Sequence, residues 1–238
     1  MLIAEISNCH FGNYKKSKDL VKAAFDHGAD LVKAQAFLPI DLVMGSKPLK
    51  FYKEVSLTPR QYKSLINYAN KIKKDSFFYS IFSPELQYLR EHTQFHKISA
   101  WQTANMSQDW LYKHADDNTF ISINQNLLLQ SDNLDYKADL NSDIYHYPDI
   151  RRGKIMYATD YMQAPQWSFI IDLRIKYWQN IGLSDHSRGI DNSLKAIEEY
   201  NVTTIEKHFT LVRDSSYRDS ILALSKGELE KLAKRLGK

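Results

Sequence analysis

Short apolar segments alternate with longer amphipathic segments along the whole chain, and this alternation restricts the fold more than any other feature. Apolar runs of about 4–8 residues are typical of buried strands, whereas longer runs with a 3.6-residue period are typical of helices. Strands are predicted at residues 2–6, 30–37, 77–82, 95–99, 119–123, 154–159, 180–184 and 203–208. Helices are predicted at residues 17–27, 58–73, 84–91, 108–113, 127–130, 165–179, 191–200 and 225–236.

Eight strand–helix units in 238 residues predict a single (β/α)8 barrel, the TIM-barrel fold. A doubly wound open sheet is the alternative that the same alternation allows. Segment 124–152 departs from the pattern, because it is rich in Asn, Asp, Ser and Tyr, and we expect a shortened helix or an irregular excursion there. No linker-like change of composition interrupts the chain, so residues 1–238 are interpreted as one domain.

The charge and the apolar pattern exclude several classes of function. Lys and Arg number 32 and Asp and Glu number 28, a net charge of +4, and the basic residues form short clusters typical of solvated helix faces. We therefore expect no nucleic-acid partner. No apolar run approaches the ~20 residues of a membrane span, and the first residues lack the basic region of a signal peptide. With Cys9 as the single cysteine, the chain is expected to be cytoplasmic.

Polar side chains occur at the carboxyl end of nearly every predicted strand. They are Glu5, Lys33, Gln35, Ser80, Lys97, Ser99, Ser122, Asn124, Thr159, Asp160, Ser184, Asp185, His186, Glu206 and His208. A charge buried in a barrel is costly unless it is paired, bound to a metal or placed in a wet site. Because a TIM barrel carries its chemistry at the carboxyl ends of its strands, we interpret the set as an active site rather than as structural ion pairs.

Two histidines in this set indicate a metal site. His186 and His208 end neighbouring strands, so both can point into the mouth of the barrel. Imidazole nitrogens bind divalent transition metals such as Mn, Fe or Zn, and carboxylates and water complete the coordination. Glu5 or Glu206 is expected either to bind the ion directly or to orient a ligand.

Two lysines in the same mouth indicate an anionic substrate. Lys33 and Lys97 lie on separate strands, and paired cations favour a ligand that carries phosphate or carboxylate. A lysine that forms a Schiff base is the other functional interpretation, because burial shifts the pKa of an ammonium readily. The residues alone leave both interpretations open. Cys9 has no candidate base near it in the sequence and is interpreted as structural.

A series of motifs follows one order along the chain. Residues 3–12 read IAEISNCHFG, 28–35 read GADLVKAQ, 97–99 read KIS, 182–187 read GLSDHS and 205–210 read IEKHFT. The series resembles that of the N-acetylneuraminate (sialic acid) synthase family, which includes the legionaminate and pseudaminate synthases. The family's versions are IAEIGxNHxG, GADxVKFQ, KIASxE, GLSDHT and IEKHFT. The resemblance covers about residues 2–230 and is weakest over 124–152.

The resemblance implies a TIM barrel that condenses phosphoenolpyruvate with the aldehyde of an open-chain N-acetylated amino sugar, giving a nonulosonic (sialic-type) acid and phosphate. His186 and His208 match the family's ligands of a divalent ion, typically Mn²⁺. Catalytic roles fall to Glu5, Glu206 and His186. Substrate contacts are expected from Lys33, Gln35, Lys97, Ser122, Ser184, Asp185 and Asp219. Asp219 corresponds to the Asp of a GPD motif, which here reads YRD.

Several positions depart from the family's pattern. The family's STPF reads SIFS at 80–83, its Ser-Gly-Glu reads AWQ at 100–102, and its STGM reads SINQ at 122–125. Strand six ends in Thr159-Asp160, and an Asp at this position would be unfavourable beside a phosphate. Family members usually carry a C-terminal antifreeze-like domain that gives an Arg to the partner's sugar site. This chain is expected to lack that domain, so either a separate lid-supplying protein completes the site or the sugar site is altered, and a homodimer is also expected.

These observations lead to one hypothesis and two rivals. The leading hypothesis is an active synthase of a nonulosonic acid, because the two lysines, two histidines and two glutamates remain in place. The first rival is a degenerate barrel that binds a sugar or a partner without turnover. The second is a different metal-dependent aldolase on the same fold.

Overall fold

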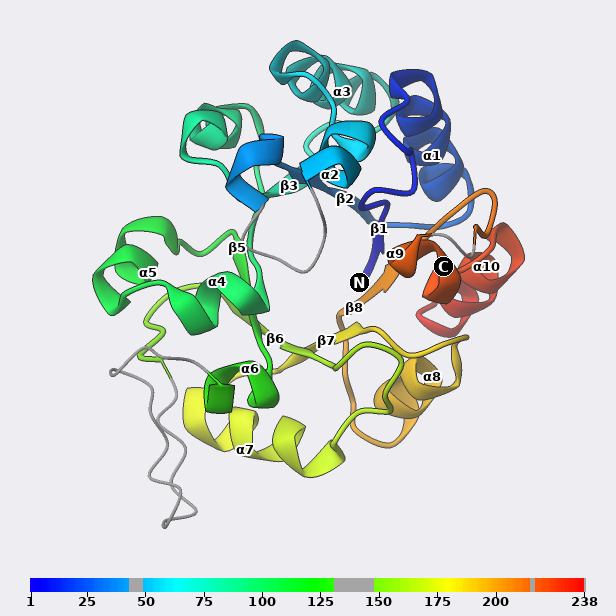
Figure 1. The fold of residues 1–238 in the computed structure, drawn as a ribbon. Helices are drawn as coiled ribbons and strands as arrows, with labels where there is room; N and C mark the ends of the chain where they lie inside the picture. Colours follow the sequence, from blue (N-terminus) through cyan, green and yellow to red (C-terminus); the bar gives the residue numbers. More distant parts are fainter. Residues whose placement is uncertain (43–48, 131–147, 215–216, 238) are drawn as a thin grey trace.

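Each strand pairs in parallel with the next one along the chain, and the last strand pairs with the first, so the sheet closes on itself (Figure 1). The computed structural model describes residues 1–42, 49–130, 148–214 and 217–237. Its strands are β1 (Leu2–Glu5), β2 (Leu31–Ala36), β3 (Phe77–Ile81), β4 (His96–Ile98), β5 (Thr119–Ile123), β6 (Lys154–Ala158), β7 (Gly182–Asp185) and β8 (Ile205–His208). The predicted (β/α)8 barrel is thereby confirmed, and the open-sheet alternative is wrong.

Helices surround the barrel on its outside (Figure 1). They are α1 (Tyr14–Asp26), η1 (Pro39–Leu42), α2 (Leu49–Val55), α3 (Pro59–Ile72), η2 (Pro84–His92), α4 (Ala100–Asn105), α5 (Gln108–His114), α6 (Gln125–Gln130), α7 (Trp167–Tyr177), α8 (Asp191–Glu198), α9 (Arg218–Leu222) and α10 (Lys226–Arg235). The segment after β3 forms a 3₁₀ helix, η2. Four elements, η1, α2, α4 and α9, were not predicted, because none exceeds seven residues and so none shows a sustained helical period.

Local sequence fixes where several helices begin. The side chain of Thr58 accepts a hydrogen bond from the backbone of Gln61, and the side chain of Gln61 returns to the backbone of Thr58, with Pro59 at the first helical position of α3. Ser225 and Glu228 form the same reciprocal cap at α10. These caps satisfy backbone N–H groups that a helix start leaves without partners.

The inside of the barrel is divided into an apolar lower half and a polar upper half. A small cluster of buried side chains fills the lower half: Ile3, Leu31, Phe78, Phe120 and Met156. The rings of Phe78 and Phe120 stack with their centroids 5.5 Å apart. A larger apolar cluster packs the outer faces of the strands against the helices. The polar strand ends therefore lie above a closed floor, at the carboxyl end of the barrel.

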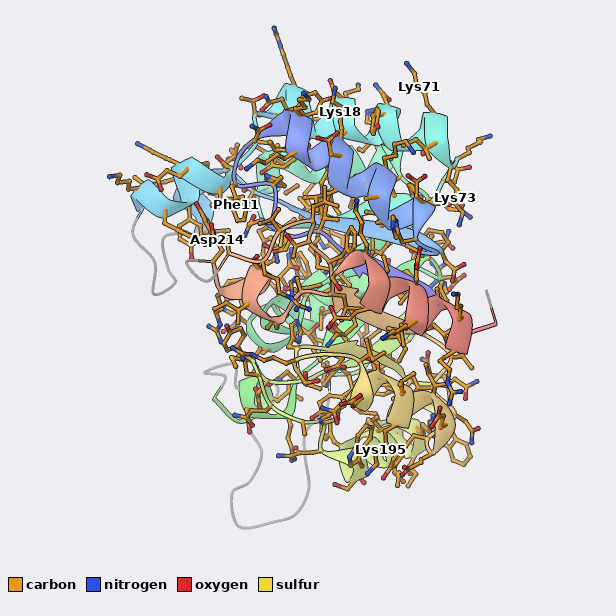
Figure 2. The ribbon with its side chains drawn as sticks, turned by 90° about the vertical axis from the view of Figure 1, so that its right-hand side faces the viewer. Phe11, Lys18, Lys71, Lys73, Lys195 and Asp214 are labelled. Atoms are coloured by element: carbon orange, nitrogen blue, oxygen red, sulfur yellow. The ribbon has the colours of Figure 1, made fainter. Side chains whose placement is uncertain are left out.

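The surface agrees with the interpretation of the basic clusters as solvated. Lys71 extends outward from the last turn of α3 (Figure 2). Lys73, which directly follows α3, is also exposed, and its ammonium donates to the carbonyl oxygen of Ala29. The ammonium of Lys18 lies 5.0 Å from the ring centroid of Tyr14 and 5.7 Å from that of Tyr68, in cation–π contacts at the surface. Among the described helices, none is long and apolar enough to span a bilayer.

A tight approach of two loops makes Gly12 a sensitive position. Gly12 has φ of +71°, and a Cβ there would lie 2.1 Å from the carbonyl oxygen of Glu54. Gly12→Ala is therefore expected to lower the free energy of unfolding by more than about 1 kcal/mol, measured by urea denaturation. Gly227→Ala is the control, because nothing lies within 4 Å of its added Cβ. Equal stability of the two variants would contradict the prediction.

Candidate active site

Strand register brings the charged strand ends together inside the barrel. Glu5 is aligned with Lys33 on one neighbouring strand and with His208 on the other. Ser184 is aligned with Glu206. Because side chains alternate between the two faces of a strand, Glu206 and His208 point into the barrel together, whereas the residue between them points outward.

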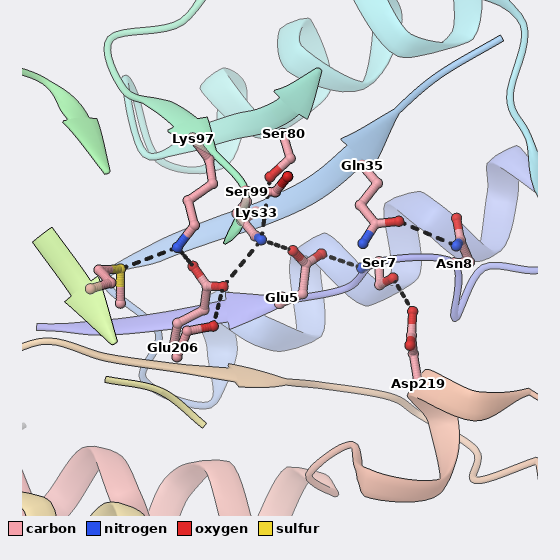
Figure 3. A network of polar contacts seen from close by, with 12 residues as sticks. Glu5, Ser7, Asn8, Lys33, Gln35, Ser80, Lys97, Ser99, Glu206 and Asp219 are labelled. Atoms are coloured by element: carbon pink, nitrogen blue, oxygen red, sulfur yellow. Dashed lines mark hydrogen bonds and ion pairs between the residues drawn. The ribbon is translucent and has the colours of Figure 1, made fainter. Parts of the chain in front are cut away.

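The centre of the site is a chain of buried ion pairs (Figure 3). The Lys33 ammonium contacts Oε2 of Glu5 and lies 3.1 Å from Oε1 of Glu206. The Lys97 ammonium lies 3.0 Å from Oε2 of Glu206 and 3.3 Å from Sδ of Met156. All four charged side chains are buried. Two cations therefore face two carboxylates, and Glu206 stands between the lysines.

Burial and pairing shift the pKa values of these groups in different directions. Burial raises the pKa of the Glu5 carboxyl to about 7 and outweighs the attraction of Lys33. At Glu206 burial acts in the same sense, but Lys33 and Lys97 together hold its pKa well below the ordinary value. Burial lowers the pKa of Lys97 to about 8. Glu206 is therefore ionised at neutral pH, whereas the pKa values of Glu5 and Lys97 lie close to neutral pH.

Two serines border this chain of charges. Ser184 Oγ donates a hydrogen bond of 2.9 Å to Oε1 of Glu206 and so fixes that carboxylate from the side opposite Lys97. Ser122 Oγ is buried and has no hydrogen-bond partner within the described ranges. An unpaired hydroxyl in a polar barrel interior is available to a ligand.

The two histidines lie side by side above the ion pairs, with ring centroids 5.4 Å apart. His186 Nδ1 lies 2.9 Å from the carbonyl oxygen of Thr159, so Nδ1 carries the proton and Nε2 keeps its lone pair. The buried Nδ1 of His208 has no hydrogen-bond partner in the part of the chain that the structure describes. Burial lowers the pKa of His186 to about 4 and also lowers that of His208. Both rings are therefore neutral at pH 7.

Two neutral imidazoles with available nitrogens fit a divalent metal ion. The hydrogen bond from His186 to Thr159 is the kind of support that orients a metal-binding histidine. Over residues 1–42, 49–130, 148–214 and 217–237, no group of three or more His, Cys, Asp or Glu residues could hold an ion. An ion here would therefore take two protein nitrogens, and water or substrate oxygens would complete its coordination.

The open part of the mouth consists of two adjoining cavities. We call the first, of about 360 Å³, the histidine chamber. It is lined by Gln35, Ala100, Asn124, Leu127, Ala158, Thr159, Asp160, Tyr161, His186, His208, Arg218 and Asp219. The second, of about 450 Å³, is the aromatic chamber. It is lined by Asn8, Cys9, Gln35, Leu42, Phe51, Tyr52, Phe82, Trp101, Tyr217, Arg218, Asp219 and Ser220.

Most of the predicted site residues lie in this one region. The charge network contains five of them, namely Glu5, Lys33, Lys97, Ser184 and Glu206. The wall of the histidine chamber contains four more, namely Gln35, His186, His208 and Asp219. Asp219 accepts a hydrogen bond of 2.5 Å from Ser7 Oγ, which joins α9 to the loop after β1 (Figure 3).

Asp185, for which a substrate contact is predicted, lies in a separate buried network on the outer side of the barrel. Its carboxylate accepts hydrogen bonds from the backbone and hydroxyl of Ser187 and from Ser193 Oγ, at 2.6–2.8 Å. Lys207 Nζ lies 3.3 Å away, and both side chains are fully buried. Asp185 points outward from β7 because it alternates with the inward Ser184. Asp185 and Lys207 therefore form a buried ion pair between β7 and β8, and the hydrogen bond from Ser193 ties this pair to α8.

Sequence reasoning placed Asp160 among the polar strand ends but missed Arg218 and Tyr161, which line the same histidine chamber. The guanidinium of Arg218 stacks on the ring of Tyr161, with Cζ 3.9 Å from the ring centroid. Tyr161 Oη donates a hydrogen bond of 3.1 Å to the backbone carbonyl oxygen of Arg218. Asp160 accepts hydrogen bonds from the side chains of Asn124 and Asn126. The only available signal for Tyr161 was its position soon after a strand. Helix α9, which contains Arg218, has five residues and is too short to show a helical period in the sequence.

Comparison with known proteins agrees with the motifs. Residues 155–238 match the model of the NeuB family. The N,N'-diacetyllegionaminic acid synthase of Campylobacter jejuni is 26% identical over 258 residues, an alignment that covers 99% of this chain and 75% of that protein.

Solved structures share the fold. An N-acetylneuraminic acid synthetase from Leptospira borgpetersenii superposes with a TM-score of 0.76 at 21% identity and covers 99% of this chain and 82% of its own. The spore coat polysaccharide biosynthesis protein spsE of Bacillus subtilis superposes with a TM-score of 0.71 at 19% identity. The superposition covers 100% of this chain and 67% of that protein. Residues 155–238 therefore match the NeuB family, and the resemblance seen in the motifs is confirmed by this match and by the similarity to a diacetyllegionaminic acid synthase.

Proposed function

We propose that this protein condenses phosphoenolpyruvate with the aldehyde of an N-acylated amino sugar and releases phosphate. The observation that carries the proposal is the pair of buried lysines, each bonded to a glutamate, beside two neutral histidines at the mouth of the barrel. Phosphoenolpyruvate carries a carboxylate and a phosphate, which are the groups that paired ammonium ions bind. The similarity to a legionaminic acid synthase supports this choice of reaction.

The charge network can bind an anion without leaving a buried, ionised carboxylate that has no cation beside it. Lys33 and Lys97 are already compensated by Glu5 and Glu206, so an incoming anion competes with these glutamates. Glu5 has a pKa near 7, so it can take up a proton when the anion replaces it beside Lys33. Glu206 stays ionised and keeps the two ammonium groups in position for the substrate.

His186 and His208 would hold the divalent ion, for which Mn²⁺ is our proposal, and the bound ion would act as a Lewis acid on the aldehyde oxygen. Thr159 keeps His186 in the tautomer that leaves Nε2 available. Arg218, stacked on Tyr161, lines the same chamber and would present a cation to the substrate.

The reaction forms one C–C bond and breaks one C–O bond. The methylene carbon of phosphoenolpyruvate attacks the aldehyde carbon, and the aldehyde oxygen becomes a hydroxyl by gaining a proton. The carbon that carries the phosphate is thereby left as an oxocarbenium centre, and water adds to it, forming a C–O bond and losing a proton. The tetrahedral intermediate then collapses to a keto group as its hydroxyl loses a proton and its C–O bond to phosphate breaks. Glu5 suits these proton transfers, because a group with a pKa near 7 both gives and accepts protons at neutral pH.

The proposal is tested with phosphoenolpyruvate that carries ¹⁸O in its bridging position. N-acetylmannosamine serves as the aldehyde and Mn²⁺ as the ion, and the released phosphate is analysed by mass spectrometry. We expect phosphate only when both substrates are present, and we expect it to contain the label. Unlabelled phosphate, or release without the sugar, would contradict the reaction. Binding of both substrates without release would favour the degenerate barrel.

His186→Ala is expected to abolish stoichiometric binding of Mn²⁺, because it leaves His208 as the single imidazole at the proposed site. The measurement is the free Mn²⁺ signal in electron paramagnetic resonance during a titration. His92→Ala is the matched control, since His92 is exposed and lies at the end of η2. Unchanged Mn²⁺ affinity in His186→Ala would remove this residue from the metal site.

A further inference from the structure

The aromatic chamber lies directly beside the histidine chamber and is the larger of the two, at about 450 Å³ against 360 Å³. Gln35, Arg218 and Asp219 line both chambers. A ligand held at the histidines can therefore extend a substituent past Gln35 and Asp219 into the second cavity.

The walls of this chamber form a preassembled apolar surface. The ring of Tyr217 packs 4.1 Å from that of Phe11 and 5.9 Å from that of Phe51, and Phe51 packs 5.5 Å from Tyr52. The side chain of Trp101 also lines the cavity and is 42% exposed. Aromatic rings that hold one another in place present apolar area at little entropic cost, which favours an apolar or aromatic ligand group.

A polar atom without a partner lies at the boundary between the chambers. Asn8 Nδ2 donates a hydrogen bond of 3.4 Å to Oε1 of Gln35 (Figure 3), which leaves Oδ1 of Asn8 at the other end of the amide. That oxygen is buried and accepts no hydrogen bond from any described residue. A buried acceptor that is left unpaired is costly, and an N–H group on a ligand would satisfy it.

We infer that the aromatic chamber binds the N-acyl group of the amino sugar and favours an acyl group much larger than acetyl, such as an aryl acyl group. The amide N–H donates to Asn8 Oδ1, the sugar carbons pass Gln35 and Asp219, and the acyl group packs against Phe51, Trp101 and Tyr217. A methyl group would leave most of this cavity to water, whereas a phenyl ring covers the aromatic walls. The inference rests on the proposed function, because it takes an amino sugar as the second substrate.

The experiment compares the binding of N-benzoyl-D-mannosamine with that of N-acetyl-D-mannosamine by calorimetry in the presence of Mn²⁺. We expect the benzoyl compound to bind at least about tenfold more tightly, the discrimination that an apolar pocket gives to added carbon. Trp101→Ala should erase this preference. Trp178→Ala is the matched control and should keep it, because Trp178 is 91% exposed and lines neither chamber.

A second comparison tests the role of Asn8. The wild-type protein should bind N-benzoyl-D-mannosamine about tenfold more tightly than 2-O-benzoyl-D-mannose, because the ester has no N–H to donate. Asn8→Ala should bind the amide and the ester equally. This ratio is measured within one variant, so a general loss of stability does not imitate the result.

Three outcomes would overturn the inference: equal affinity for the benzoyl and acetyl sugars, a preference that survives Trp101→Ala, or no binding of either sugar. Titration of the same samples with phosphoenolpyruvate separates this failure from that of the proposed function. Binding of phosphoenolpyruvate without a benzoyl preference would reject the acyl chamber alone. A benzoyl preference without phosphoenolpyruvate binding would reject the proposed reaction and keep the chamber.

Discussion

Glu206→Gln should lower the free energy of unfolding by about 3–5 kcal/mol, the cost of breaking a buried ion pair by removing one partner. Glu206 lies 3.1 Å from the ammonium of Lys33 and 3.0 Å from that of Lys97. Lys33 keeps Glu5 as a partner, but Lys97 has no other carboxylate within ion-pair distance among the described residues. The variant therefore buries an uncompensated cation. Urea denaturation followed by circular dichroism measures the loss.

Adding Lys97→Met to Glu206→Gln provides the internal control, because it removes the cation that the first substitution leaves unpaired. We expect the loss of stability in the double variant to be smaller than the sum of the losses in Glu206→Gln and Lys97→Met, by a coupling energy of about 1–3 kcal/mol. A loss below about 1 kcal/mol in Glu206→Gln, or losses that simply add, would show that Glu206 does not compensate the lysines.

Lys97→Met should weaken the binding of phosphoenolpyruvate by about 10- to 100-fold, because a hydrogen bond to a charged group contributes about 1.5–3 kcal/mol. The fold should persist, since Glu206 remains paired with Lys33 and a methionine fills much of the lysine's volume. Calorimetry measures the affinity.

The matched control is Lys207→Met, which makes the same substitution at a buried lysine on the outer face of β8. This variant should lose stability, because it leaves Asp185 buried without its cation, and should retain affinity for phosphoenolpyruvate. An unchanged affinity in Lys97→Met would remove Lys97 from the binding site.

The pH dependence of binding gives Lys97 a second test. Burial lowers the pKa of its ammonium to about 8, so the cation is present below that pH and is lost as the pH rises through it. The affinity of the wild-type protein for phosphoenolpyruvate should fall between about pH 7 and 9. In Lys97→Met this step should be missing.

The sequence predicts the barrel well because each strand is a short apolar run between two amphipathic ones. The strand β5 (Thr119–Ile123) coincides with its prediction. Strand alternation also places Glu206 and His208 correctly on one inward face. The same alternation turns Asp185 outward, away from Ser184, whereas its substrate contact was predicted from its place in the motif and remains a prediction.

Two features of the site depend on contacts that no local pattern encodes. The sequence predicts Lys33 and Lys97 as cations that bind an anionic substrate. In the fold, Lys33 pairs with Glu5 on the neighbouring strand, and Lys97 pairs with Glu206, 109 residues further along the chain. The aromatic chamber is built from short elements, α2, α4 and α9, that have no sustained period. Its position beside the histidines follows only from the closed barrel.

Calorimetric titration with phosphoenolpyruvate, first with Mn²⁺ and then with EDTA, is the decisive test of the proposed site, because it requires no choice of sugar. We expect saturable binding with a stoichiometry of one, since the paired lysines and glutamates form a single site. The absence of binding in both conditions would refute the proposed function and would mean that the motifs record ancestry rather than activity.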